Sequence, residues 1–190
     1  GLVVGGNPTR PASELVVSTA LVLFRRDLRL EDNPAWSAAC ARHDVVIPAY
    51  IHADDDGRWS LGAASRWWLH HSLTALDQSL RETGAGLYVQ RGEPLDVLRE
   101  VIRRSGARAV YWNRRYEPGS IAADTQIKSA LQEEGVAVHT HNAALWCEPW
   151  RIATRHAQPY KVFTPYWRSL RPQLHPTEPL SAPCVPGWIQ

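Results

Sequence analysis

Short apolar segments alternate with amphipathic helical patterns along most of the chain, and this alternation constrains the fold more than any other feature. The expected strands cover residues 20–24, 45–51, 87–90, 109–112 and 136–139, and the expected helices cover residues 34–42, 62–83, 94–105 and 121–134. Three of the helices are followed by a glycine and then by a strand, which is typical of the short loops of α/β proteins. The sequence therefore predicts an α/β fold with helices on both faces of a parallel sheet.

The first expected strand, residues 20–24, belongs in the centre of this sheet because it is a continuous apolar run, as in strands buried on both faces. Right-handed crossovers then give a doubly wound, Rossmann-like sheet of five parallel strands in the order 3-2-1-4-5. Residues 20–140 would form this domain. Residues 1–19 read as a loose leader, and residues 141–190 as an irregular, aromatic and Pro-rich connector between domains.

A charged loop follows the first strand and contains Arg25, Arg26, Asp27 and Arg29. Ligands of open α/β sheets bind outside the carboxyl ends of the strands, so this loop could form a polar floor for an anionic or aromatic ligand, or for a second domain. It could equally be a self-neutralising cluster of salt bridges, and both interpretations stay open. The loop after the fourth strand reaches the same edge and contains Asn113, Arg114, Arg115, Tyr116 and Glu117. Asp32 or Asn33 is expected to cap the following helix.

Several classes of protein are excluded by motif and composition. No apolar run is long enough to span a membrane, and the first residues lack the pattern of a signal peptide. The three cysteines are odd in number and widely spaced, which favours a reducing cytoplasm. Motifs of serine hydrolases, P-loop proteins and zinc proteases are missing from the sequence. Two histidine pairs, His70–His71 and His139/His141, are expected to pack rather than to bind a metal.

Charge is unevenly distributed along the chain. Residues 1–148 carry 16 Arg and Lys against 18 Asp and Glu, whereas residues 149–190 carry 5 against 1. A basic C-terminal stretch of this kind would face either nucleic acid or another domain.

The stretch FRRDLRLEDNPA at residues 24–35 resembles the opening strand and loop of the photolyase/cryptochrome family. Three later stretches match the family in the expected order: GAASRWWLHHSLTALDQSL at 62–80, AVYWNRRYEP at 109–118 and PYKVFTPYWRSL at 159–170. The resemblance spans residues 20–171 and corresponds to the N-terminal α/β domain, the antenna-binding domain of a class I-like deoxyribodipyrimidine photolyase.

The resemblance implies a parent enzyme, a carbon–carbon lyase that uses FAD and blue light to split pyrimidine dimers in damaged DNA. In the family the FAD lies in a helical domain, which would follow this chain and be its main partner. An antenna chromophore (a folate, a deazaflavin or a flavin) would lie in the crevice next to the α/β domain. Candidate residues for this crevice are Arg25, Asp27, Arg29, Asn113, Arg115 and Glu117, and no catalytic residue is expected in the chain.

The usual contacts of two antenna classes are not matched. Folate-binding members carry an Asn-Glu pair where this chain has Gly119 and Ser120. Deazaflavin-binding members carry an acidic residue and an arginine at positions that correspond to Arg115 and Ala123. A different antenna such as a flavin, a variant pocket and no antenna therefore all remain open. Four tryptophans of the α/β domain are expected in the core or the crevice wall: Trp36, Trp67, Trp68 and Trp112.

The expected function is that of the N-terminal domain of a light-dependent DNA repair enzyme, located in the cytoplasm. Alone, the chain would bind no cofactor, remain colourless and repair no DNA. Residues 146–170 would pack against the helical domain, so the isolated chain would expose aromatic side chains and self-associate. The alternatives are the N-terminal domain of a cryptochrome blue-light receptor and a nucleotide-binding α/β module, although the latter would need a Gly-rich phosphate loop.

Overall fold

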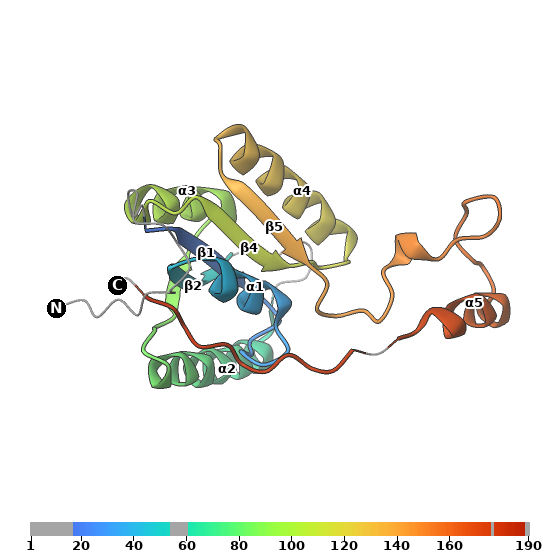
Figure 1. Ribbon diagram of the computed structural model, residues 1–190, viewed down its shortest axis with the longest axis horizontal. Coiled ribbons are helices and arrows are strands. Elements are labelled where there is room, and N and C mark those ends of the chain that lie inside the picture. Colours follow the sequence, from blue (N-terminus) through green and yellow to red (C-terminus); the bar gives the residue numbers. More distant parts are fainter. Residues whose placement is uncertain (1–16, 54–60, 176, 189–190) are drawn as a thin grey trace, which may run out of the picture.

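The computed structural model describes residues 17–53, 61–175 and 177–188, and its centre is a five-stranded parallel sheet (Figure 1). The strands are β1 (Thr19–Phe24), β2 (Val45–His52), β3 (Tyr88–Arg91), β4 (Ala109–Asn113) and β5 (Ala137–His141). All neighbouring strands pair in parallel, and their order is β3-β2-β1-β4-β5. The predicted doubly wound α/β fold, with β1 in its centre, is confirmed.

β1 is central because both of its faces and both of its edges are covered. All six of its residues are buried, and it pairs with β2 on one side and β4 on the other. Alternate side chains of a strand point to opposite faces. Leu21 and Leu23 accordingly enter one apolar cluster, whereas Val22 and Phe24 enter the other.

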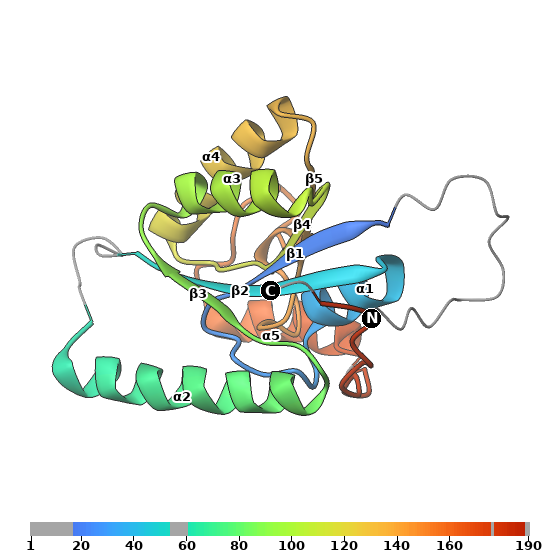
Figure 2. The same ribbon diagram turned by 90° about the vertical axis from the view of Figure 1, so that its left-hand side faces the viewer.

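Helices cover both faces of the sheet (Figure 2). On one face lie α1 (Pro34–Arg42) and α2 (Ala63–Glu82), and on the other lie α3 (Pro94–Ser105) and α4 (Pro118–Glu133). Trp36 of α1 is fully buried, and its ring centroid lies 5.7 Å from that of Phe24. Leu98 of α3 and Leu131 of α4 are fully buried in the opposite cluster.

Local signals set the ends of these helices. Of the two residues expected to cap α1, Asn33 is the cap: its Oδ1 accepts a hydrogen bond from the Trp36 backbone N–H at 3.2 Å. Gly84 follows α2 with a φ of +86°. A glycine two residues further on, Gly86, would also be expected to end α2 in a left-handed turn, but its φ is not in the positive range. A Cβ at Gly86 would lie 3.0 Å from the ring of Trp188, so this glycine accommodates the close approach of Trp188 instead.

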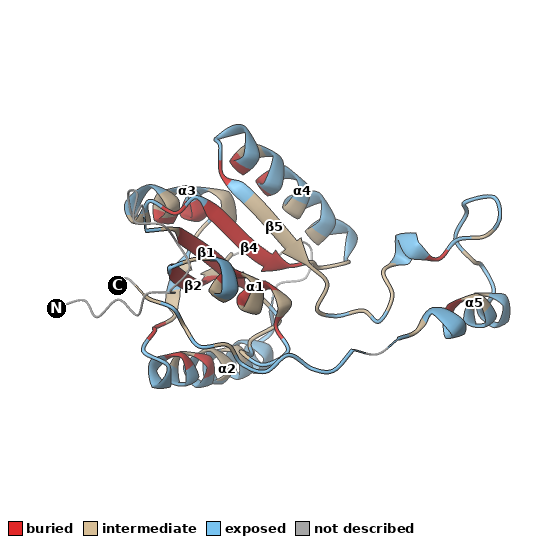
Figure 3. Ribbon diagram, in the orientation of Figure 1, coloured by how far each residue is buried: buried red, intermediate tan, exposed pale blue. Residues whose placement is uncertain are grey.

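Only the second half of α2 packs on the sheet. The leucines Leu69, Leu73, Leu76 and Leu80 recur at helical spacing, but only Leu76 and Leu80 are buried; Leu69 and Leu73 are half-buried, and the residues from Ala63 to Trp68 are exposed. The first half extends past the sheet toward the carboxyl ends of the strands (Figures 2 and 3). Among the described helices, none combines the length and the apolarity needed to cross a lipid bilayer.

After β5 the chain makes a long excursion away from the sheet and then returns to it (Figure 1). The excursion contains the short helix η1 (Pro149–Arg151), helix α5 (Phe163–Leu170) and the short helix η2 (Arg171–Gln173). The returning segment reaches β2, where the Val46 N–H donates a 3.0 Å hydrogen bond to the Gly187 carbonyl oxygen. Val185 and Trp188 pack against the apolar cluster under α1 and α2. The end of the described chain is therefore part of the α/β domain, not a free tail.

A cluster of three histidines surrounds Tyr111 on the α1 side of β4 and β5. The His43 Nε2 lies 3.0 Å from the Tyr111 hydroxyl, and the rings of His139 and His141 stack on the Tyr111 ring with centroid distances of 4.6 and 6.1 Å. Burial lowers the pKa of all three imidazoles below its usual value, and the positive charge of Arg42 acts in the same direction on each. The expected packing role of His139 and His141 agrees with this arrangement.

This histidine cluster predicts a loss of stability in mild acid. A histidine whose pKa is lower in the folded than in the unfolded protein contributes stability above its unfolded pKa of about 6.5, and this contribution is lost as the pH falls below that value. The free energy of unfolding, measured with urea, should thus fall from about pH 7.5 to about pH 5. His139→Phe keeps a ring on Tyr111 and removes one titrating group, so it should flatten this dependence; an unchanged slope would contradict the prediction.

Candidate functional site

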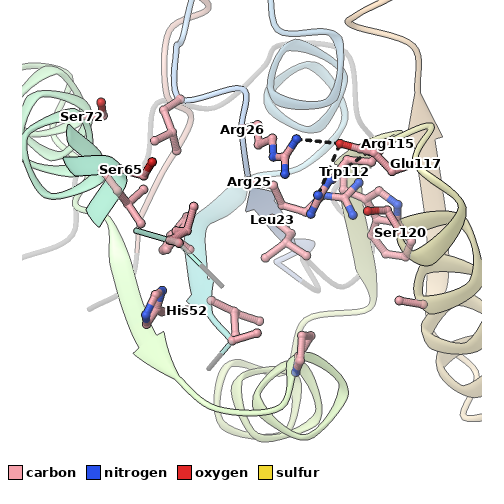
Figure 4. A pocket seen from close by; sticks show the side chains of 18 of the residues that line it. Leu23, Arg25, Arg26, His52, Ser65, Ser72, Trp112, Arg115, Glu117 and Ser120 are labelled. Carbon is pink, nitrogen blue, oxygen red and sulfur yellow. Dashed lines mark hydrogen bonds and ion pairs between the residues drawn. The ribbon is translucent and has the colours of Figure 1, made fainter. Parts of the chain in front are cut away.

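A large cavity lies outside the carboxyl ends of the strands, at the edge where the sequence placed a ligand. Its volume is about 1420 Å³, and it is bounded by the ends of β1, β2 and β4, the first half of α2 and the first turns of α4 (Figure 4). Small-molecule sites usually have volumes of about 300 to 1000 Å³, so the cavity is large enough for a cofactor.

The lining of this cavity is cationic and partly aromatic. Six arginines contribute to it, against two carboxylates from Glu117 and Asp124. The arginines are Arg25, Arg26, Arg29, Arg66, Arg91 and Arg115. Trp68 supplies aromatic surface from α2, whereas Trp112 of β4 borders the cavity but is almost fully buried. An excess of positive charge next to flat apolar side chains suits a planar ligand that carries negative charge.

Arg25 is held firmly at the floor of the cavity by residues of the neighbouring strand β4 and of helix α4. Its Nη1 donates to Oδ1 of Asp124 at 2.6 Å, and its Nη2 donates to the Asn113 carbonyl oxygen and to Oδ2 of Asp124. The indole N–H of Trp112 donates to the same carboxylate at 3.2 Å. Both charged side chains are less than one-fifth exposed, so this is a nearly buried ion pair.

Asn113 links the two loops at the strand ends. Its side-chain amide donates to the Asp27 carboxylate at 2.5 Å and to Oδ1 of Asn33 at 2.7 Å, and its Oδ1 accepts from the Ala35 N–H at 3.2 Å. Asn113 is buried, and these bonds use both of its donor hydrogens as well as its acceptor. The amide therefore sets the distance between the β1–α1 loop and β4.

Glu117 connects arginines from both loops at the rim of the cavity. It lies 2.7 Å from Arg26 Nη1 and 3.4 Å from Arg115 Nε (Figure 4). The pKa of Glu117 is lowered, first because its carboxylate accepts a hydrogen bond from its own backbone N–H and then because of Arg115 and Arg26. Glu117 therefore stays ionised and keeps the two arginines near each other.

The structure brings all six predicted crevice residues to this one edge. Arg25 faces the large cavity, Asp27 and Asn113 face a neighbouring cavity of about 470 Å³, and Arg29, Arg115 and Glu117 border both. Sequence reasoning missed Asp124, which neutralises Arg25, and it missed Arg66 and Arg91 in the lining. Nothing in the sequence pointed to Asp124 as a site residue, since it lies within an ordinary helical pattern. Arg66 stands beside the two tryptophans of the matching α2 stretch, which was the signal that could have found it.

The two interpretations of the charged loop are both partly supported. Two of its arginines pair with carboxylates outside the loop rather than with Asp27 of the loop itself: Arg25 pairs with Asp124 and Arg26 with Glu117. The loop is thus a tertiary salt-bridge cluster that at the same time forms the floor of a cavity.

Some of the aromatic and histidine predictions were wrong. Trp36 and Trp112 are core residues and Trp68 borders the cavity, but Trp67 is 62% exposed and is not among the residues that line the cavity. His70 and His71 are exposed beside it rather than packed on the sheet, with the His71 ring 4.3 Å from that of Trp67. The helical pattern does not reveal that the sheet ends before this half of α2. Within the described residues, no cluster of three or more His, Cys, Asp or Glu side chains is arranged to hold a metal ion.

Comparison with known proteins identifies the family. The DNA photolyase family model matches residues 20–184. The chain is 41% identical to a deoxyribodipyrimidine photo-lyase of Agrobacterium fabrum over 89% of this chain and 35% of the relative, and 38% identical to cryptochrome-1 of Arabidopsis thaliana over 86% of this chain and 24% of the relative. A crystal structure of a class III photolyase from Agrobacterium tumefaciens superposes with a TM-score of 0.86 at 40% identity, over 94% of this chain and 37% of that one.

The chain thus spans about a third of the photolyases that it matches. The matching part is the five-stranded α/β domain, with the charged loop, the cavity at the strand ends and most of the connector. Because the family model, the curated relatives and the solved structure all point to the same family, the chain belongs to the DNA photolyase family.

Proposed function

We propose that this chain is the antenna-hosting α/β domain of a light-dependent DNA photolyase, and that the cavity at the strand ends holds the chromophore. The observation that carries the proposal is the cationic, partly aromatic cavity of about 1420 Å³ at the edge where this type of fold binds ligands. The parent protein would bind FAD in a separate helical domain and split pyrimidine dimers in DNA.

The three free cysteines favour a reducing compartment and support a cytoplasmic location.

The lining favours a planar anion. The proposed contacts are Arg25, Asp27, Arg29, Asn113, Arg115 and Glu117, of which Arg29, Arg115 and Glu117 border both cavities. Gly119, Ser120 and Ala123 also line the large cavity, at the positions where known antenna classes have larger polar contacts. These small side chains leave room, and a flavin nucleotide fits the combination of cationic and aromatic surface.

Titration with candidate chromophores tests this proposal. The purified chain is titrated with FMN, FAD, a reduced folate and a deazaflavin, and binding is followed by absorption and fluorescence between about 350 and 500 nm. We expect the chain to be colourless as purified and to bind weakly, because an antenna between two domains loses part of its contacts here. A longer protein that continues into the helical domain should bind at least about tenfold more tightly, which corresponds to about 1.4 kcal/mol.

Arg115→Ala should weaken chromophore binding by about tenfold, because a charge-assisted contact to the ligand is lost. The matched control is Arg99→Ala, which removes the same charge from α3, where Arg99 pairs with Glu134. Equal affinities for both variants, or no binding of any chromophore by the longer protein, would contradict the proposed site.

A cryptochrome parent is the second candidate, because two plant cryptochromes of Arabidopsis thaliana are 38% and 39% identical to this chain. A light-dependent dimer-repair assay on the longer protein separates the two: repair favours the photolyase, and a photoreduced flavin without repair favours the cryptochrome. The α/β domain alone should repair no DNA in either case.

The proposed helical partner predicts self-association of the isolated chain. Around η1 and α5 large apolar side chains are exposed, among them Trp146 at 79% and Phe163 at 70%. Exposed apolar patches of more than a few hundred Å² are uncommon on monomers. Sedimentation at increasing concentration should therefore show dimers or larger species, and Phe163→Ser with Trp167→Ser should shift them toward monomer. A clean monomer at high concentration would contradict this prediction.

A further inference from the structure

Two points of the connector that are far apart in the sequence meet at the β1–α1 loop. Ala143, just after β5, and Leu180, where the chain returns, are the two feet of an arm formed by residues 144–175. The arm carries α5 well away from the sheet, whereas its feet lie against the domain (Figure 1).

One pair of residues, Arg29 and Asp32, contacts both feet. The Arg29 guanidinium donates to the Ala143 carbonyl oxygen at 3.3 Å and, through Nη2 and Nε, to the Asp32 carbonyl oxygen at 2.8 and 3.2 Å. The Asp32 N–H donates to the Leu180 carbonyl oxygen at 2.7 Å. A continuous chain of hydrogen bonds therefore runs from one foot through Arg29 and Asp32 to the other.

The backbone at Asp32 is specialised for this contact. Its φ is +46°, in the left-handed region that few residues other than glycine adopt, although Asp and Asn tolerate it. Such a conformation persists when surrounding contacts hold it in place. Both backbone polar groups of Asp32 are used in the chain of bonds, while its carboxylate lies 3.7 Å from Arg29 Nη2 at an exposed position.

A second anchor fixes the first foot on its other side. Arg114 donates from Nε to Glu148 at 2.8 Å and from Nη1 to the Thr140 carbonyl oxygen at 2.6 Å, and its guanidinium lies 5.9 Å from the centre of the Trp150 ring. These contacts therefore fix the direction in which the arm leaves the domain, and its two feet, Ala143 and Leu180, meet at Arg29 and Asp32.

The surface that the arm presents is apolar and basic. Phe163 and Trp167 of α5 stack with centroids 6.2 Å apart and are exposed. Residues 149–175 contain five Arg and Lys and no Asp or Glu. A partner that covers this surface would need an apolar face with an acidic rim.

We propose that Arg29 and Asp32 form a clamp that closes the base of the arm and positions α5 for docking of the part of the protein that the relatives carry beyond this domain. Arg29 then positions the arm in addition to bordering the proposed chromophore cavity. The identity of the docked part rests on the proposed function, whereas the clamp itself is a property of this chain and is measured without chromophore or partner.

The position of the arm is measured by pulsed electron spin resonance on the 190-residue chain. Spin labels are attached to cysteines introduced at Thr125 of α4 and Thr164 of α5, both exposed, after replacement of the three native cysteines. Arg29→Ala should broaden the distance distribution between the labels. Amide exchange of Asp32, relative to core amides of β1, should become about tenfold faster, since loss of the Arg29 hydrogen bonds loosens the contact between the Asp32 N–H and Leu180.

Two variants serve as matched controls. Arg26→Ala removes the same charge from the same loop, but Arg26 pairs with Glu117 and should leave both readouts unchanged. Asp32→Asn keeps the backbone groups and tolerates the positive φ, so it should also leave them unchanged. The proposed clamp is wrong if Arg29→Ala leaves the distribution of label-to-label distances as narrow as in the unmodified chain, or if Arg26→Ala broadens it equally. It is also wrong if exchange of the Asp32 amide accelerates no more than exchange of the β1 core amides.

Discussion

Asn113→Ala is expected to lower the free energy of unfolding by about 3 kcal/mol, because the substitution leaves several buried polar groups without partners. The lost bonds are those to Asp27, to Asn33 and from the Ala35 N–H. Urea unfolding at neutral pH measures the change. The effect should be large for one amide because each of its three hydrogen-bonding positions is used inside the protein.

Two further variants test this explanation. Asn142→Ala removes an asparagine that also makes three hydrogen bonds, but these stay within the half-exposed turn formed with Ala144 and Leu145, so the expected loss is about 1 kcal/mol. Asn113→Asp replaces a donor by a carboxylate beside Asp27 and should be worse than Asn113→Ala at pH 7. If Asn113 and Asn142 prove equally important, the proposed link between the two loops is wrong.

Arg25→Met is expected to lower the free energy of unfolding by about 3 kcal/mol, because it leaves the Asp124 carboxylate nearly buried without its cation. Adding Asp124→Asn should recover about half of this loss, since the amide carries no charge and can still accept from the Trp112 N–H. A double-mutant cycle by urea unfolding measures the coupling, which should be at least about 1.5 kcal/mol.

An exposed pair provides the comparison for this cycle. Arg104 lies 3.5 Å from Glu100 on the surface of α3, and Arg104→Met should change the free energy of unfolding by no more than about 0.5 kcal/mol. Strict additivity of Arg25→Met and Asp124→Asn would show that the two side chains do not stabilise each other, and that the floor of the cavity is held by other contacts.

The stability of the edge and its capacity to bind a ligand come from the same residues. Arg25 and Asn113 hold the two strand-end loops together, and Arg115, which borders the cavity, is paired with Glu117. Arginines that are already paired lose less freedom when an anion arrives, so a pre-organised edge favours binding.

Much of the fold was determined by local sequence patterns. The run Ala20–Phe24, the amphipathic helices and the glycines after α3 and α4 predicted the five strands, their order and most element ends to within a few residues. These features depend on neighbours within one or two turns, and burial of both faces of β1 leaves few alternative topologies. The six candidate crevice residues were found for the same reason, because they directly follow the strands of a predicted parallel sheet.

Contacts between distant parts of the chain were decided only by the tertiary structure. The pairing of Arg25 with Asp124, the exposure of Trp67 and the approach of Trp188 to Gly86 join residues that are remote in sequence or depend on where the sheet ends. No periodicity encodes such contacts, since they arise when separately formed elements pack and their polar groups find partners. The charged loop shows the difference: its sequence determined where the charges would lie, and packing against β4 and α4 decided which of them are neutralised and which face the cavity.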